Sequence, residues 1–416
     1  MAELAEPAGT AVGATTVVVG SSIAGVRAAQ ALRAEGFSGR LVLVGEESEL
    51  PYDKPPLSKH FLHDADGRAD NCLLTAEKAS DLRIELRLGV PATGLDVAAK
   101  RLHLADGATI DWDSVVLATG ASARPSPWPV RSGVHVLRTL ADARALRWDL
   151  SRDRAVLIVG GGFIGAEVAA AARALGREVT VIDPLPAPIG RVVGPELGAA
   201  FNDLHQRHGV TTVFGVGVKS IAGQAGDLDV TLADDRVLRA GTVVVGIGAL
   251  PNDGWLADSA LEVADGVLCD EYCRAVNTED VYVVGDVARQ FRRSTGEYVR
   301  VEHWTNAVDS AATAAHNIAH PGRLRAHTAV DYVWSDQYDW RIQIVGHPAR
   351  ATAHELVGTF TGDSARGAAL YYDEPGRLLA AVTVNWPRAL ATCRKTVADE
   401  GSLAEARERL AAANAG

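Results

Sequence analysis

The stretch covering residues 16–46 constrains the fold of this chain more than any other. An apolar β-branched run is followed by a turn with Gly20 and Gly25 at its ends, then by an alanine-rich segment expected to be helical over residues 26–35. A second apolar run ends in Glu46. This order is typical of a βαβ unit that binds a dinucleotide. The start of its helix offers unpaired N–H groups and a positive dipole end to a pyrophosphate.

The turn departs from the usual G-x-G-x-x-G at its middle position, which is Ser22. The middle glycine normally lets the backbone approach the phosphates, and a serine is small enough to be tolerated there. Glu46 at the tip of the second strand can hold a pair of ribose hydroxyls. The alternative for this stretch alone is a plain βαβ unit with tight packing.

A second stretch repeats the pattern and completes it. Residues 155–159 are expected to form a strand, residues 160–165 carry a full G-x-G-x-x-G, residues 167–175 are expected to be helical, and the next strand ends in Asp183. Asp183 can accept hydrogen bonds from a ribose diol and would repel a ribose phosphate, so NADH is favoured over NADPH. Two such units in one chain suggest a transfer between two bound dinucleotides.

The composition narrows the class of protein. A length of 416 residues with 47% hydrophobic residues predicts two or three folded domains, and a net charge of -11 argues against a general nucleic-acid binder. Four scattered cysteines fit a reducing cytoplasm without a disulfide framework. Cys269 and Cys273 lack nearby histidines and are expected to be buried thiols, so no metal site is predicted. No apolar run is long enough to span a membrane, and residues 1–14 are expected to form a disordered tail.

Four further patterns mark the rest of the chain. Two prolines before Ser58 predict a rigid turn in which Ser58 could cap a short helix; Lys59 could then reach a flavin edge or a phosphate, or be a solvated loop lysine. Three prolines within residues 124–129 indicate a crossing between domains. Asp286 ends a strand and could hold ribitol hydroxyls or serve only as a turn residue. Residues 300–306 are expected to open an alanine-rich helix that runs to about residue 320 and is ended by Pro321-Gly322.

The pattern changes again near residue 325. Strands are expected at residues 341–345 and 378–384, and Ser402 with Glu405 predicts a capping box at the start of a last helix. These elements indicate a third domain of the α+β class.

Together these motifs resemble the oxygenase-coupled, NADH-dependent ferredoxin reductases, which are FAD enzymes with a glutathione-reductase-like fold. The similarity runs from about residue 16 to about residue 394. It rests on the two glycine turns and on segments 52–59, 118–120, 284–286 and 334–338. The resemblance implies an α/β chain with two Rossmann-like dinucleotide-binding domains and a C-terminal α+β domain. The implied domains are residues 15–122 with 252–322 for FAD, residues 123–251 for NAD, and residues 323–416 for the C-terminal domain.

The resemblance also implies roles for individual residues. Lys59 and Glu167 are the expected catalytic residues, paired across the two dinucleotide domains, with Lys59 near the isoalloxazine. Trp304 is expected at the flavin edge, and Glu302 near the nicotinamide with Glu167. The implied cofactor-binding residues are Gly20, Ser22, Ile23, Ala24, Gly25, Glu46, Lys59, Ala92, Thr119, Gly120, Arg138, Gly160, Gly162, Ile164, Gly165, Glu167, Asp183, Gly248, Gly285, Asp286, Glu302 and Trp304.

The expected function is therefore transfer of a hydride from NADH to FAD and of single electrons to a two-iron ferredoxin. Residues 50–59 contain no cysteine, so the electrons should leave for an outside carrier rather than an internal disulfide. Such ferredoxins are usually acidic, and a basic patch should receive them. The candidates, which could also be a solvated charged loop, are Arg289, Arg292, Arg293 and Arg300.

Two alternatives stay open at this point. One is a rubredoxin- or nitrite-reductase-type flavoprotein, which differs in its partner. The other is a flavoprotein of the apoptosis-inducing-factor kind, in which NADH drives dimerisation; that class is expected to carry a targeting segment and a basic face. Neither nucleic acid nor a membrane is an expected partner, and the chain could be a monomer or a homodimer.

Overall fold

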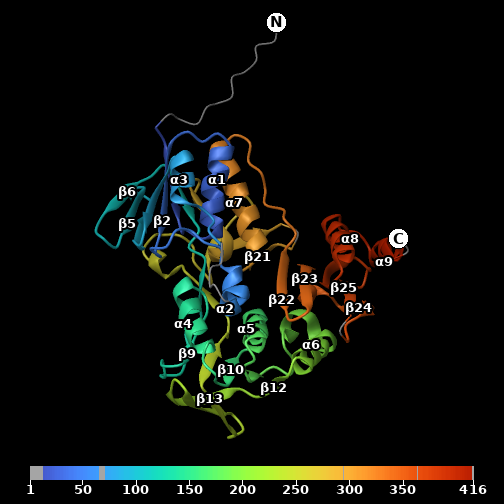
Figure 1. The fold of residues 1–416 in the computed structure, drawn as a ribbon. Helices are drawn as coiled ribbons and strands as arrows, with labels where there is room; N and C mark the ends of the chain where they lie inside the picture. The colour runs from blue at the N-terminus through green and yellow to red at the C-terminus, as the bar shows by residue number, and fades with distance from the viewer. Residues whose placement is uncertain (1–12, 65–70, 294, 363, 415–416) are drawn as a thin grey trace. The chain divides into compact units, whose positions relative to one another are not determined.

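The computed structural model describes residues 13–64, 71–293, 295–362 and 364–414, which form two compact units (Figure 1). The first unit contains residues up to Asp53, Asn71–Ser122 and Leu250–Ala329. The second contains the three segments that begin at Lys54, Ala123 and Val330. The predicted tail lies almost wholly outside the described residues. None of the described helices combines the length and the hydropathy needed to cross a bilayer.

A five-stranded parallel sheet forms the centre of the first unit, in the order β19-β7-β1-β2-β3. Apart from the edge strand β3, its strands are mainly apolar runs because both faces of the sheet are buried there. Val17 of β1 lies opposite Val42 of β2. The strands are β1 (Thr15–Val19), β2 (Arg40–Gly45), β3 (Ile84–Leu88), β7 (Ser114–Leu117) and β19 (Val281–Val283).

Helices α1 (Ile23–Ala34) and α7 (Trp304–Ala319) lie side by side in this unit (Figure 1). Their shared core is rich in alanine, including Ala28 and Ala311, together with Val18 of the sheet. Small side chains let the two helices approach closely. The helix predicted to open within residues 300–306 is confirmed, and it begins at Trp304.

The opposite face of this sheet is covered by smaller antiparallel elements. Leu102 and Ile110 belong to an antiparallel hairpin and pack there against Val17 and Val19. The hairpin turns at Asp106-Gly107, a dipeptide typical of such turns. The remaining elements of the unit are α3 (Ala76–Asp81), β4 (Ala92–Asp96), β5 (Arg101–Leu104), β6 (Thr109–Asp111), η2 (Gly254–Leu256), β18 (Val267–Cys269), η3 (Gly285–Val287), β20 (Ala288–Arg292) and β21 (Glu297–Arg300).

The second unit repeats the arrangement with a parallel sheet in the order β12-β11-β10-β16-β9. Here α5 (Phe163–Ala174) connects β10 (Val156–Val159) to β11 (Val179–Asp183). The internal repeat is confirmed. The other elements of this part are η1 (Pro55–Ser58), α2 (His60–His63), β9 (Val134–His135), α4 (Leu140–Leu150), α6 (Gly190–Arg207), β12 (Val210–Phe214), β13 (Val218–Gln224), β14 (Asp227–Leu232), β15 (Val237–Ala240) and β16 (Thr242–Val245). Strands β8 (Ala121–Ala123) and β17 (Ala249–Pro251) span the points where the chain passes between units.

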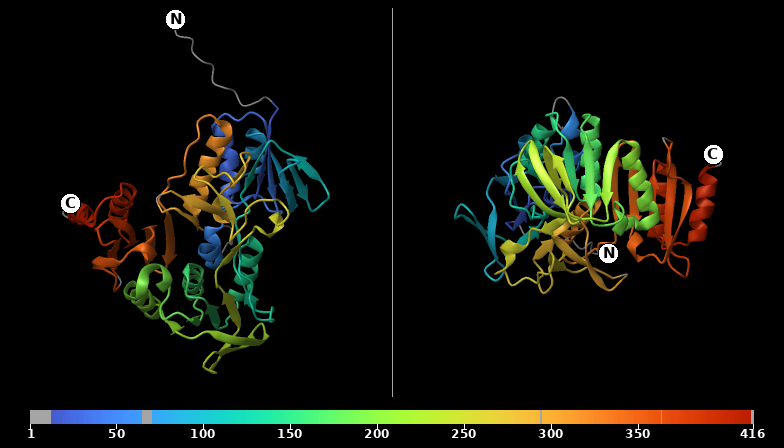
Figure 2. Two further views of the ribbon diagram at one scale, coloured as in Figure 1. Left: turned by 180° about the vertical axis from the view of Figure 1, so that it is seen from behind. Right: turned by 90° about the horizontal axis from the view of Figure 1, so that it is seen from below.

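The C-terminal part belongs to the same unit and is built on an antiparallel sheet in the order β22-β23-β26-β25-β24. Phe201 of α6 packs with Trp340 and Ile342 on one face of it, and two C-terminal helices, red in Figure 2, cover the other face. Ser402 and Glu405 form the predicted reciprocal capping box. The elements are β22 (Tyr332–Gln337), β23 (Trp340–Gly346), η4 (Pro348–Arg350), β24 (Ala353–Thr359), β25 (Arg366–Tyr372), β26 (Leu378–Val384), α8 (Pro387–Ala398) and α9 (Leu403–Asn414).

The predicted starts of the two dinucleotide helices are wrong by three or four residues. Ser22 and Gly162 are the N-caps, with extended backbone angles, so α1 begins at Ile23 and α5 at Phe163. The helices therefore begin inside the glycine turns. The first N–H groups of each helix thus belong to the turn itself.

Candidate active site and cofactor cradles

The first cradle is the turn that joins β1 to α1. Gly20 has a φ of +118°, and a Cβ there would lie 2.1 Å from the carbonyl oxygen of Ala118. A Cβ at Gly25 would lie 1.7 Å from the carbonyl oxygen of Gly20. Ser22 makes no capping hydrogen bond within the described structure, so its side chain leaves the first N–H groups of α1 available. The turn therefore fits a pyrophosphate.

Two further turns of the first unit end neighbouring strands of the same sheet. Thr119 follows β7; its hydroxyl donates to the carbonyl oxygen of Asn252 at 2.8 Å, and the Asn252 amide donates back to the Thr119 carbonyl at 2.9 Å. Asn252 also fixes Gly120, whose carbonyl accepts its backbone N–H at 2.9 Å. Carboxyl ends of parallel strands form the usual ligand-binding edge of such sheets.

The turn after β19 packs directly against α1. Gly285 has a φ of +69°, and a Cβ there would lie 3.0 Å from the Cβ of Ala24. This contact brings the half-buried Asp286 to the start of α1, where Ile23 begins the helix. Asp286 therefore lies close to the first cradle.

The other expected cofactor contacts in this unit lie on separate elements. The Trp304 indole at the start of α7 donates to Asp53 Oδ1 at 2.9 Å. Glu302 is paired with Arg300, and Ala92 begins β4. Glu46 is exposed just after β2. Asp53 was not among the predicted site residues; only its position within the proline-rich motif could have indicated it.

The second cradle has the same shape with a more open middle. Gly160 has a φ of +113°, and a Cβ there would lie 2.2 Å from the Gly246 carbonyl oxygen. A Cβ at Gly165 would lie 2.0 Å from the Gly160 carbonyl oxygen. At Gly162 an added Cβ would have nothing within 4 Å, so the backbone is open to close approach. Ile164 is 43% exposed in the first turn of α5, which leaves its apolar side chain available to a ligand.

Asp183 at the end of β11 stabilises this turn through hydrogen bonds. Its carboxylate accepts the backbone N–H of Gly161 at 2.7 Å and that of Leu185 at 2.8 Å. Any ribose hydroxyl must share the carboxylate with these donors. Gly248, with a φ of +107°, accepts the N–H of Arg124 through its carbonyl at 2.9 Å. Arg138 precedes α4, and its backbone N–H donates to the Asp142 carboxylate.

Glu167 is the centre of a buried polar network. Only 3% of its side chain is exposed, and Lys59 Nζ lies 2.9 Å from its Oε2 atom. The Ser58 hydroxyl also donates to Oε2, and the Ser335 hydroxyl donates to Oε1 at 2.7 Å. Gln337 donates to the Ser335 hydroxyl at 3.1 Å. Each carboxylate oxygen therefore has a donor, which a buried charge requires.

Lys59 pairs with Glu167 as expected, but the expectation that the pair joins two domains is wrong, because both residues belong to the second unit. The predicted capping role of Ser58 is wrong. Lys54 is the N-cap of η1 and Lys59 that of α2, because the Ser58 hydroxyl is directed to Glu167 instead. Ser335 was also missed as a site residue. Its place in the segment 334–338, which carries the resemblance, was the available signal.

The buried cysteines do not offer reactive thiolates. Cys269 and Cys273 are buried as expected, and burial raises the pKa of Cys273 to about 12. Burial likewise raises the pKa of Cys393 to about 12. A thiol must be ionised to act as a nucleophile.

The two glycine cradles, one in each unit, define a reductase that uses two dinucleotides. Residues 14–311 match the pyridine nucleotide-disulphide oxidoreductase family and residues 332–413 the reductase C-terminal family. The chain belongs to the pyridine nucleotide-disulphide oxidoreductase family, among its ferredoxin reductases, as the motifs predicted. FAD and NAD(H) are its cofactors, and both cradles fit a dinucleotide.

Curated relatives resemble the chain over almost its whole length. The ferredoxin–NAD(+) reductase component of the anthranilate 1,2-dioxygenase system of Burkholderia cepacia is 38% identical over 386 residues, covering 92% of this chain and 93% of that protein. Rhodocoxin reductase of Rhodococcus erythropolis is 37% identical over 387 residues, covering 92% and 89%.

Two solved structures share the fold throughout. The ferredoxin reductase for the CYP199A2 system from Rhodopseudomonas palustris has a TM-score of 0.89 at 32% identity, covering 94% of this chain and 96% of that one. The covalent putidaredoxin reductase–putidaredoxin complex gives 0.88 at 30% identity, covering 98% and 100%. The glutathione-reductase-like fold with a C-terminal domain is confirmed.

Proposed function

We propose that this chain takes a hydride from NADH and passes electrons singly to a two-iron ferredoxin that serves a monooxygenase or dioxygenase. The observation that carries the proposal is the buried Glu167, which holds Lys59 next to the second cradle in the same compact unit. FAD, when bound, accepts two electrons together and releases them one at a time. The names of the two relatives state that one is a ferredoxin–NAD(+) reductase component and the other a rhodocoxin reductase.

Lys59 and Glu167 act as orienting and charge-tuning groups rather than as acid and base. Hydride transfer needs close, dry alignment and little proton movement by side chains. Glu167 is fixed by three donors, so it holds the lysine in one position. The positive charge of Lys59 favours the reduced, anionic form of the flavin ring.

Asp183 supports NADH as the preferred donor, because its carboxylate accepts hydroxyl hydrogens and repels a phosphate. The remaining expected contacts are proposed to bind FAD or NADH; they include Glu46, Ala92, Arg138, Gly248 and Glu302.

We also propose that the chain works in the cytoplasm, since its four thiols are unpaired in the structure.

The β20–β21 hairpin is the proposed docking site for ferredoxin. Arg300 is only 14% exposed and is held by Glu302 and Asp265, while Arg289 donates to the carbonyl oxygen of Ala264. Arg293 is 78% exposed, although it is paired with Glu271. Of the four arginines, Arg293 therefore offers the most accessible charge to an acidic partner.

An anaerobic spectrum tests the function. The purified protein should be yellow, should bleach with NADH, and should regain its colour when oxidised ferredoxin is added. A colourless protein that cannot be reconstituted with FAD would overturn the proposal. Reoxidation by rubredoxin but not ferredoxin would favour the first alternative, and a slow, air-stable reduced state with NADH-dependent dimers would favour the second.

Charge reversal tests the docking site. Arg292→Glu with Arg293→Glu should slow ferredoxin reduction by roughly tenfold at low salt, while dye reduction with NADH survives, because rim charges mainly steer encounter. Arg239→Glu, at an exposed arginine of β15, is the control. Equal loss of ferredoxin reduction and dye reduction would show that the hairpin is not the docking site.

A further inference from the structure

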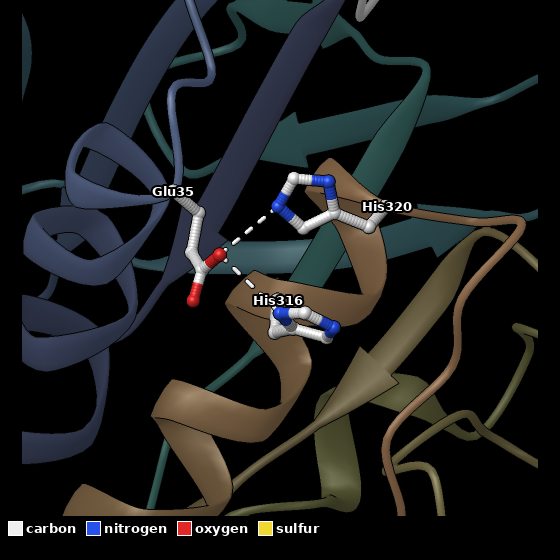
Figure 3. Close-up of side chains that lie close together, drawn as sticks. All are labelled: Glu35, His316 and His320. Atoms are coloured by element: carbon white, nitrogen blue, oxygen red, sulfur yellow. Dashed lines mark hydrogen bonds and ion pairs between the residues drawn. The ribbon is translucent and has the colours of Figure 1, made fainter. Parts of the chain in front are cut away.

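Glu35, His316 and His320 come together in the first unit, where α1 and α7 end (Figure 3). Glu35 is the C-cap of α1, His316 lies in the last turn of α7, and His320 is the C-cap of α7. One carboxylate oxygen, Oε2, lies 3.3 Å from His316 Nδ1 and 3.0 Å from His320 Nε2. Among the described residues, this is the one group of three potential metal ligands whose donor atoms all lie within 4.8 Å of one another.

The second ring nitrogen of His316 fixes which atom carries hydrogen. Its Nε2 lies 3.1 Å from the carbonyl oxygen of Arg323, which can only accept. Nε2 therefore carries the hydrogen. In a neutral ring Nδ1 then has a lone pair, which faces the carboxylate oxygen of Glu35. Two lone-pair atoms that face each other need a cation between them, either a proton or a metal ion. An outer hydrogen bond to a backbone carbonyl is the usual support of a metal-ligating histidine.

We propose that Glu35, His316 and His320 bind a divalent transition-metal ion of the zinc class. The ligands are Glu35 Oε2, His316 Nδ1 and His320 Nε2, and water completes the shell. A tetrahedral zinc ion with bonds of about 2.0–2.1 Å separates its ligand atoms by roughly 3.3 Å. The two nitrogen-to-oxygen distances of 3.3 and 3.0 Å are close to this value.

The surroundings allow an ion to enter. The exposed fractions of the three side chains are 30% for Glu35, 20% for His316 and 38% for His320. The His-x-x-x-His spacing places both rings on one helix face, a spacing that zinc sites use.

The ion would fasten α1 to α7 at the ends away from the first cradle. The other end of α1 carries the glycine turn, and α7 begins at Trp304. The expected role is structural: a ligand bound only by the folded state raises its stability. Dye reduction by holoenzyme with full FAD should not change. This inference does not depend on the ferredoxin assignment.

Metal titration of the holoenzyme tests the site. Holoenzyme dialysed against a chelator should bind one zinc ion per chain by calorimetry and metal analysis, and saturating zinc chloride should raise its Tm by roughly 3 °C. His316→Ala with His320→Ala should weaken binding by at least roughly 100-fold and abolish the Tm rise. Glu35→Gln should weaken binding less.

A matched variant controls for loss of surface histidines. His63→Ala with His103→Ala removes two exposed histidines outside the cluster and should bind zinc like the parent protein. FAD content by absorbance shows whether each variant is folded. The proposal is overturned if the parent protein binds no stoichiometric zinc. It is equally overturned if the His316→Ala, His320→Ala variant, with normal FAD content, keeps the parent's affinity.

Discussion

The two glycine cradles share one backbone design but differ in what their helices carry. Gly20 and Gly160 take nearly the same φ, +118° and +113°, and at the last glycine of each turn an added Cβ would collide with a backbone oxygen, at 1.7 Å for Gly25 and 2.0 Å for Gly165. Seven residues after the first glycine, α1 has Arg27 and α5 has Glu167. Arg27 is half-buried and donates to Gln30 at 3.0 Å on its own helix, whereas Glu167 is buried and holds Lys59.

The acids at the ends of the second strands differ as well. Glu46 is exposed, while Asp183 accepts the N–H groups of Gly161 and Leu185. The first cradle is thus shaped mainly by packing, and the second also by a polar network. The comparison teaches that the same strand, turn and helix can be stabilised by packing alone or by packing together with a polar network. Which of the two applies depends on what packs against the helix.

The largest effects should come from filling the crowded glycine positions. Gly25→Ala should give protein without FAD, and Gly165→Ala should give yellow protein that NADH no longer bleaches, because each new Cβ would lie within 2.0 Å of a backbone oxygen. FAD absorbance and anaerobic NADH titration measure the two outcomes. Gly254→Ala, where an added Cβ meets nothing within 4 Å, is the control. If both cradle variants lost the same cofactor, the assignment of one dinucleotide to each cradle would be wrong.

Breaking the network of the second cradle should have the next largest effect. Glu167→Gln leaves the amine of Lys59 without its charged partner, and we expect flavin reduction by NADH to slow by roughly 100-fold. Ser335→Ala removes one hydrogen bond to the carboxylate and should slow it by roughly tenfold. Stopped-flow bleaching at saturating NADH measures both. Glu178→Gln, at an exposed site between α5 and β11, is the control, and unchanged rates in both network variants would contradict the role.

Asp183 should show a moderate effect on cofactor choice. Asp183→Asn keeps a group able to accept from Gly161 but removes the charge that repels a phosphate. The ratio of kcat/KM for NADH over NADPH should fall by roughly tenfold, since like-charge repulsion is lost. Steady-state dye reduction with both nucleotides gives the ratio. An unchanged ratio would place the discrimination elsewhere in the second unit.

Exchanging the middle residues of the turns should have the smallest effect. Ser22→Gly and Gly162→Ser should each change cofactor affinity by less than about threefold, because the Ser22 side chain makes no capping bond and Gly162 has open space beside it. Equilibrium dialysis for FAD and fluorescence titration for NADH measure the affinities. A tenfold loss in Gly162→Ser alone would show that the second cradle requires a closer backbone approach.

Much of the fold could be predicted because its signals are local. The strand, turn and helix of each cradle, the hairpin at residues 101–111 and the capping box at Ser402 depend on spacings of a few residues. The helix starts were misplaced because Ser22 and Gly162 act as N-caps through backbone geometry, which residue type alone does not reveal.

By itself, the sequence determined two dinucleotide-binding turns, the acids beside them and an α+β segment at the C-terminal end. Only the tertiary structure decided which residues hold Glu167: Ser58 lies 109 residues away in sequence and Ser335 lies 168 residues away. The same is true of Glu35 and His316, which are 281 residues apart. Hydrophobic periodicity and turn chemistry act over a few residues. Which distant polar side chains meet depends on how whole elements pack, because a buried charge needs partners wherever the fold supplies them.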